Sequence, residues 1–308
     1  MLVPPIPGRG TLVRGFRRML SGSEQPPGWV RALEQPGDAG WFGPGSAVWQ
    51  VHGSVTTLVG GVRALLLQSL HPLALAGVLQ HSDYRDDALG RLHRTNRFLT
   101  TTTYGSSRQA MAAVAAVRRT HERVTGHADD GRPYAAGDPH LLLWVHAGLI
   151  DSMLVAYQAL SGGRVDADAY VGEMADVAVA LGIPDPPRDQ RGLTAAIEAM
   201  RPELAGGADV REVIRFLARP PLPRPAQPGY QVILRAAFDL LPPWAGDLLG
   251  VGRRPAPVRL AELASAGLLL SGLRLALGGP PPGERAALRR IAATGARNPV
   301  APDATMDP

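Results

Sequence analysis

Apolar residues recur along this chain at the spacing of helices. Positions repeating every three to four residues predict amphipathic helices over residues 48–69, 73–81, 88–102, 107–124, 139–160, 167–181, 193–200, 210–218, 230–240, 260–277 and 284–293. Asp138-Pro139 is a typical helix start, and Gly105, Gly126, Gly162 and Gly182 follow positions where helices are expected to end. No alternation of β-branched residues between hairpin turns competes with this pattern. The sequence therefore predicts an all-α fold of about ten helices.

Proline and glycine set the expected limits of the helical region. Residues 1–45 are crowded with both and are predicted to form an irregular N-terminal arm, whereas residues 296–308 are predicted to be a flexible tail. Residues 46–295 show no break in composition and no internal repeat. We therefore expect a single helical domain over residues 46–295.

The composition excludes several kinds of chemistry. All 32 basic residues are arginine, and the chain has no cysteine. These absences exclude thiolate-ligated and covalently attached haem, iron–sulfur clusters, cysteine zinc sites, lysine Schiff bases and the P-loop lysine. The net charge is +5, but arginines are scattered, usually beside carboxylates, and 5% of residues are aromatic. This arrangement argues against a nucleic-acid partner.

Two features bear on location. Arg17-Arg18 is not followed by an apolar segment, so no export signal is expected and a cytoplasmic location is predicted. The apolar segments 65–79 and 260–277 are interrupted, the first by His71-Pro72 and the second by Glu262 and Arg274. Neither offers about 20 uninterrupted apolar residues. Both are therefore predicted to be buried core helices, while peripheral membrane contact stays open.

Acid–base or metal chemistry is expected where the histidines gather. All eight lie within one stretch: His52, His71, His81, His93, His121, His127, His140 and His146. The pair His121 and His127 resembles a zinc-protease motif, but its spacing of six residues turns the second ring about 120° away. A zinc protease is therefore rejected.

His121 shares an apolar helix face with valines at positions 114, 117 and 124. Such a histidine is most often a core residue with a satisfied hydrogen bond. Arg118, one turn earlier on the same side, instead favours an anionic ligand beside the ring. Both interpretations stay open from the residues alone.

Two further clusters are candidates. Arg91, Arg94 and Thr95 share one face of a predicted helix, and this face is either solvated or the polar lining of an apolar cavity. His71 precedes Pro72 at a predicted helix break, where its ring could bond carbonyls that the proline leaves free.

Later in the chain, Asp138 is predicted to cap the helix that follows it. Trp144 and His146, on that helix, are predicted to line the surface or cavity against which the helix lies.

Taken in order, these motifs resemble a family of haem-dependent oxygenases that includes the latex-clearing-protein rubber oxygenases and the oxygenase of the mycophenolic acid pathway. The resemblance covers about residues 46–295. Its motifs are His71-Pro72, Gly77-Val78, His81-Ser82, Arg91-Leu92-His93-Arg94-Thr95, Arg118-Arg119-Thr120-His121-Glu122-Arg123-Val124-Thr125-Gly126, Tyr134, Asp138-Pro139, Leu142-Leu143-Trp144-Val145-His146-Ala147 and Gly182-Ile183-Pro184.

The resemblance implies an all-α fold around a non-covalent b-type haem, with His121 as the proximal iron ligand. It places Arg91, Arg94 and Thr95 beside the haem pocket as catalytic candidates. Arg91, Arg118 and His71 are the cofactor-binding candidates. Dioxygen and a lipophilic, isoprenoid or otherwise unsaturated small molecule are the implied partners, and an electron donor is compatible with this chemistry.

Arg94 departs from the family pattern. Rubber oxygenases have a lysine at this position that can lie on the distal side of iron. A guanidinium stays protonated and cannot ligate, so an open or water-filled distal position is expected. This departure and the expected lack of export both argue against rubber itself as the substrate.

Two alternatives stay open. One is a helical lipophile-binding or membrane-peripheral protein without redox chemistry. The other is a non-haem iron enzyme that uses several of His71, His81, His121 and His146, although the sequence shows no clear set of two histidines and one carboxylate.

Overall fold

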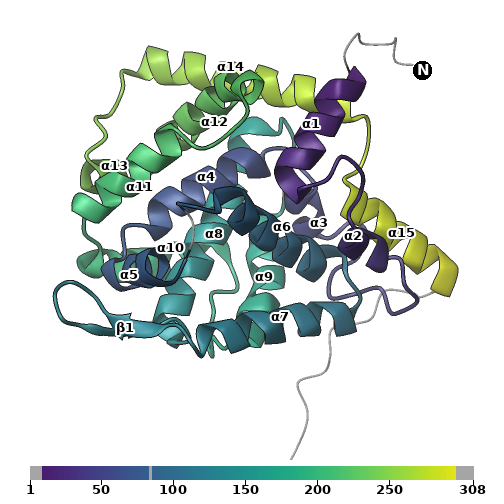
Figure 1. The fold of residues 1–308 in the computed structure, drawn as a ribbon, viewed down its shortest axis with the longest axis horizontal. Helices are drawn as coiled ribbons and strands as arrows, with labels where there is room; N and C mark the ends of the chain where they lie inside the picture. The colour runs from purple at the N-terminus through teal and green to yellow at the C-terminus, as the bar shows by residue number, and fades with distance from the viewer. Residues whose placement is uncertain (1–8, 83–84, 296–308) are drawn as a thin grey trace, which may run out of the picture.

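The computed structural model describes residues 9–82 and 85–295 (Figure 1). Within them, fifteen α-helices and one two-stranded sheet form the fold. The helices are α1 (Arg9–Ser21), α2 (Gly28–Ala32), α3 (Ala47–His52), α4 (Thr57–Gln68), α5 (Pro72–His81), α6 (Ala88–Tyr104), α7 (Ser107–His121), α8 (Pro139–Leu160), α9 (Ala167–Leu181), α10 (Gln190–Met200), α11 (Ala208–Ala218), α12 (Gln227–Asp239), α13 (Pro243–Leu249), α14 (Ala256–Leu277) and α15 (Pro282–Thr294). The strands are β1 (Thr125–His127) and β2 (Pro133–Ala135), and 3-10 turns lie at Arg201–Glu203 (η1) and Arg224–Ala226 (η2). The predicted all-α fold is confirmed.

Helices α4 and α8 form the centre of the core. They pack along each other, and most apolar residues of α8 are buried. Gly60 allows this close approach, because a Cβ there would lie 2.9 Å from the sulfur of Met153. Figure 1 shows α12 and α14 on one side of this pair and α6, α7 and α9 on the other.

The chain after α7 differs from the predicted helix 107–124. The helix ends at His121, and residues 125–135 form an antiparallel hairpin in which Gly126 pairs with Tyr134. A Cβ at Gly126 would lie 2.6 Å from the Tyr134 hydroxyl. Gly126 is therefore needed for close strand pairing.

The predicted helix 48–69 is two helices in the structure. α3 ends at His52, where the N–H of Gly53 bonds the carbonyl of Trp49, and α4 begins at Thr57. The Ser54 hydroxyl accepts a hydrogen bond from the N–H of Thr56 between them. Helix α13 was not predicted either, because proline and glycine flank its few apolar residues.

The N-terminal arm is not irregular as predicted, because it contains α1 and α2. Side chains of α6 satisfy the last carbonyls of α1: His93 Nε2 lies 3.0 Å from the Met19 oxygen, and the Asn96 amide donates to the Leu20 oxygen at 3.1 Å. Arg9 also donates to the Ala276 oxygen of α14 at 2.7 Å. Tertiary contacts stabilise a helix that its two glycines disfavour. The predicted tail, 296–308, lies outside the described residues.

One arginine ties the remainder of the arm to the bundle. Arg290 of α15 is fully buried, and its guanidinium donates to the carbonyls of Leu33, Asp38, Ala39 and Tyr104. Burial lowers the pKa of this guanidinium. The negative charge of the Asp38 side chain acts in the opposite direction and is the smaller of the two effects.

Two helices are long and apolar enough to cross a membrane, judged by length and composition. In α8, 67% of the most apolar window is buried inside the protein, but in α14 the share is 17%. The bent pair of α4 and α5 passes the same test when taken together, with an angle of 106° between them. The prediction that 260–277 is a buried core helix is therefore wrong, because α14 lies on the surface with Leu260, Leu268 and Leu275 exposed.

Candidate functional site

Unsatisfied imidazole nitrogens mark the candidate site. Among the described residues, seven buried side-chain polar atoms have no hydrogen-bond partner. Four of them are ring nitrogens of His71, His121 and His146. A buried polar atom without a partner is costly. These rings are therefore the candidates for bonding a ligand or a metal, although His71 Nε2 also lies 3.5 Å from the Glu203 carboxylate.

His121 is the last residue of α7 and is half-buried. Helix α7 begins with a capping box at Ser106 and Gln109, and its buried residues Ala110 and Val114 face the core. Nδ1 of His121 is buried and has no hydrogen-bond partner. Burial also lowers the pKa of the ring. His121 is thus a neutral imidazole, the form that ligates metals.

His71 lies at the sharp bend between α4 and α5. Pro72 starts α5, with His71 as the extended residue before it. The ring is 1% exposed, and neither nitrogen has a hydrogen-bond partner. The carbonyls that the bend frees are bonded by other groups: Trp144 donates to the Gln68 oxygen at 3.3 Å, and the N–H of Ala205 donates to the Leu70 oxygen at 2.9 Å. The predicted structural role of the ring, bonding these carbonyls, is therefore wrong.

His71 faces His140 and Glu203, which the sequence does not bring together. His140 follows Pro139 at the start of α8, and Glu203 ends the turn η1. His140 Nε2 lies 2.9 Å from both carboxylate oxygens of Glu203, and His71 Nε2 lies 3.5 Å from one of them. Burial lowers the pKa of His71, and Glu203 partly opposes this. No spacing in the chain indicates this cluster, because Glu203 is 63 residues from His140 in a short 3-10 turn.

The predicted arginine candidates have partners of their own. Arg118 is exposed and donates to the Ala180 carbonyl at 3.3 Å, at the end of α9. Arg91 is half-buried and donates to the Ser82 hydroxyl at 2.6 Å. Arg94 pairs with Asp87 at 3.1 Å and is exposed, as is Thr95. The structure thus places Arg91, but not Arg94 or Thr95, partly inside the protein.

Two other buried histidines, His52 on α3 and His146 on α8, differ in whether their ring nitrogens are hydrogen-bonded. His52 Nδ1 lies 2.8 Å from the Thr103 hydroxyl, and its Nε2 lies 3.1 Å from the Tyr170 hydroxyl. His146, on α8, is buried with Nε2 unpartnered. Burial lowers the pKa of both rings to about 4. His52 is a satisfied core histidine, whereas His146 is not.

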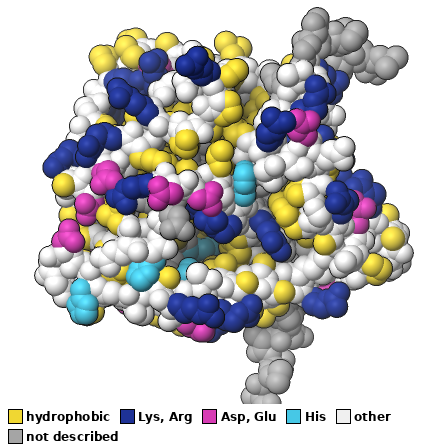
Figure 2. All heavy atoms as spheres, viewed as in Figure 1, with side chains coloured by type: hydrophobic (Ala, Val, Ile, Leu, Met, Phe, Trp, Pro, Cys, Tyr) yellow, Lys and Arg dark blue, Asp and Glu magenta, His cyan; other side chains and the backbone are white. Residues whose placement is uncertain are grey.

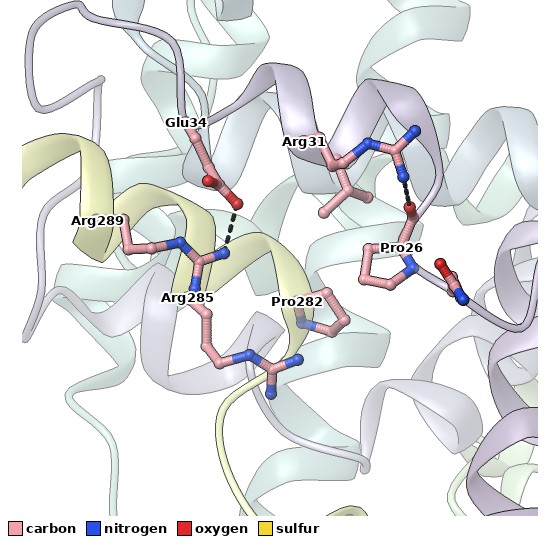
Figure 3. A pocket seen from close by; sticks show the side chains of 8 residues that line it. Pro26, Arg31, Glu34, Pro282, Arg285 and Arg289 are labelled. Carbon is pink, nitrogen blue, oxygen red and sulfur yellow. Dashed lines mark hydrogen bonds and ion pairs between the residues drawn. The ribbon is translucent and has the colours of Figure 1, made fainter.

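Two surface cavities lie away from these histidines. One, of about 240 Å³, is lined by Arg31, Glu34, Arg285 and Arg289 between the arm and α15 (Figure 3). Its cations have partners, because Arg289 pairs with Glu34 and Arg31 donates to the Pro26 carbonyl at 2.8 Å. The other, of about 230 Å³, lies beside α12 and α13. Neither contains a predicted site residue.

Comparison with known proteins identifies the family. Residues 49–271 match the family model described as "ER-bound oxygenase mpaB/B'/Rubber oxygenase, catalytic domain". No curated protein and no solved structure matches the chain. The family match spans most of the chain, from α3 to α14, and includes every residue discussed above as a site candidate. The protein therefore belongs to the mpaB and rubber oxygenase family, whose catalytic domain makes it an oxidoreductase.

Proposed function

We propose that the protein is a b-type haem-dependent oxygenase that uses dioxygen on a lipophilic small molecule, with His121 as the iron ligand. The single observation that carries this proposal is the state of His121, a neutral, half-buried ring with a buried nitrogen that has no partner. With no cysteine in the chain, a thiolate ligand is excluded. The substrate class comes from the family description, which includes rubber oxygenases.

The residues present fit a haem held by one imidazole. Bound haem would supply the site that activates dioxygen. His121 would hold the iron through a ring nitrogen, and its lowered pKa favours the neutral ring, in which one nitrogen has a lone pair for a metal. His146 Nε2 and His71 Nδ1 are further buried nitrogens that can hydrogen-bond a cofactor or substrate.

The arginines would orient the cofactor. Arg91 is half-buried on α6, and Arg118 lies one turn before His121 on α7. A guanidinium binds carboxylates through two parallel hydrogen bonds, so both residues suit haem propionates. Arg94 and Thr95 lie further along α6 and are exposed, so they would contribute only where the cofactor or substrate reaches the protein surface.

A visible spectrum tests the proposal. We expect protein expressed with haem supplied to show a Soret band. The band should be lost in His121→Ala and kept in His93→Ala, because His93 bonds the Met19 carbonyl. A colourless protein that does not take up added haemin would overturn the proposal. So would a Soret band that His121→Ala leaves unchanged.

We further propose that the protein works at the cytoplasmic surface of a membrane, where a lipophilic substrate dissolves. The observation in favour is α14, whose outward face carries Leu260, Leu268 and Leu275. Figure 2 shows apolar and basic side chains together along the upper edge of the molecule, where Figure 1 places α14. Anionic lipids of the cytoplasmic leaflet attract such a surface.

A further inference from the structure

Three segments far apart in the chain meet at one point with metal-ligating side chains. His71 comes from the bend between α4 and α5, His140 from the first turn of α8, and Glu203 from η1. One ligand atom from each residue lies within 4.8 Å of the other two. Two histidines and one carboxylate are a donor set that divalent zinc and iron share.

His71 supplies the observation that points to a ligand. Its ring is 1% exposed and aimed at Glu203, with Nε2 at 3.5 Å, yet neither of its nitrogens is hydrogen-bonded. A core histidine that serves packing alone would be satisfied, as His52 is. An ion bonded to Nε2 would remove the cost of leaving this buried nitrogen unpaired.

We infer that His71, His140 and Glu203 form a binding site for a divalent first-row transition ion, separate from His121. Ligand atoms lie about 2.1 Å from such an ion, so two of them sit up to about 4.2 Å apart. The distances of 2.9 Å between His140 and Glu203 and 3.5 Å between His71 and Glu203 lie within this limit, and the ligand nitrogens of His71 and His140 lie within 4.8 Å of each other. Because His140 and Glu203 are exposed, a water molecule can complete four-fold coordination.

The charges around the cluster permit a cation. Glu203 supplies one negative charge, and both histidines can ligate as neutral rings. Arg132 is a cation that interacts electrostatically with both His71 and Glu203. Arg132 is exposed and pairs with Asp130 at 2.7 Å, so its charge is largely offset.

Metal binding would replace a hydrogen bond. His140 Nε2 and Glu203 bond each other directly, and an ion between them would take the place of that contact. Ligation through Nε2 needs the neutral tautomer of the ring that carries its proton on Nδ1. The ion would then join the α4–α5 bend, the start of α8 and η1, so we expect binding to raise the thermal stability of the protein.

Calorimetry with Zn²⁺ tests the site on the full chain without a polyhistidine tag, after treatment with a chelator. We expect one Zn²⁺ per chain and a raised Tm. Glu203→Gln and His140→Ala change exposed side chains and should weaken binding at least tenfold, in line with removal of a metal ligand or its partner.

Matched variants separate this site from other histidines and from haem. His127→Ala changes an exposed histidine on β1 and should bind Zn²⁺ as the unmodified protein does. His121→Ala should also keep Zn²⁺ binding although it is expected to lose haem, so the two proposals can fail independently. No saturable binding would overturn the inference, and so would binding that Glu203→Gln leaves unchanged.

Discussion

At the scale of single residues, the fold treats its histidines in different ways. His52 is bonded through both nitrogens, whereas His146 is equally deep and has a nitrogen without a partner. Burial lowers the pKa of His146 to about 4, so the folded protein keeps this ring neutral where an unfolded chain would protonate it. His146 therefore links folding stability to pH.

The sign of this link follows from the lowered pKa. In the unfolded chain His146 has a pKa of about 6.5, so its ring binds a proton below that pH, whereas the ring in the folded protein stays neutral until the pH approaches 4. The free energy of unfolding therefore falls as the pH drops from about 6.5 toward 4. A shift of this size corresponds to about 3 kcal/mol for His146. We predict that His146→Leu reduces, but does not abolish, the dependence of unfolding free energy on pH between 7 and about 4.5, measured by urea denaturation, because the pKa of His52 is lowered to the same value.

The control for this measurement is His127→Gln, which changes an exposed histidine of the hairpin. It should leave the slope of stability against pH unchanged. If the unfolding free energy of His146→Leu depended on pH as strongly as that of the unmodified protein, His146 would not contribute to this pH dependence.

At the scale of elements, the sequence predicts helices well where local signals coincide with burial. The bounds 139–160 and 167–181 are those of α8 and α9, since Asp138 and Asp166 each cap the first turn and Gly182 adopts a left-handed conformation after α9. Helix α1 could not be predicted, because the groups that satisfy its carbonyls lie on α6.

The candidate site divides in the same way. The local pattern of its helix singles out His121 as a candidate, whereas no local pattern singles out Glu203, because the packing of η1 beside α8 brings it to His140. The exposure of α14 could not be predicted from the sequence either. An apolar segment has the same pattern whether protein or another phase covers it.

Gly60 and Gly61 are adjacent in α4, but we predict that their substitution by alanine changes the stability of the protein in opposite directions. A Cβ at Gly60 would lie 2.9 Å from the Met153 sulfur and 3.0 Å from its Cα, whereas a Cβ at Gly61 would meet nothing within 4 Å. Gly61→Ala should stabilise the protein by about 1 kcal/mol through helix propensity. Gly60→Ala should destabilise it by about 1–3 kcal/mol, because α4 and α8 must separate. Urea denaturation measures both, and equal effects of the two substitutions would contradict the packing described here.

At the scale of the whole molecule, the positive charge is not spread evenly. Residues 9–21 and 227–278, which contain α1, α12, α13 and α14, hold nine arginines and three carboxylates. The remainder of the chain holds 23 arginines and 24 carboxylates, close to neutrality. The chain's excess of basic residues thus coincides with its most exposed apolar helix, and α1 contacts α14 directly through Arg9.

An exposed apolar helix face in a region with an excess of arginines is suited to the interface of an anionic bilayer, where leucines enter the acyl boundary and guanidinium groups meet lipid phosphates. We predict that the protein sediments with vesicles of phosphatidylcholine and phosphatidylserine but much less with phosphatidylcholine alone, and that added salt releases it. Leu268 is 77% exposed at the middle of α14. Leu268→Asp should therefore weaken binding about tenfold or more without lowering Tm. Met111→Asp changes an exposed apolar residue of α7, on the opposite side of the molecule in Figure 1, and should have no effect. If Leu268→Asp instead left vesicle binding intact and converted a dimer into a monomer, the face of α14 would be a contact between two copies of the chain.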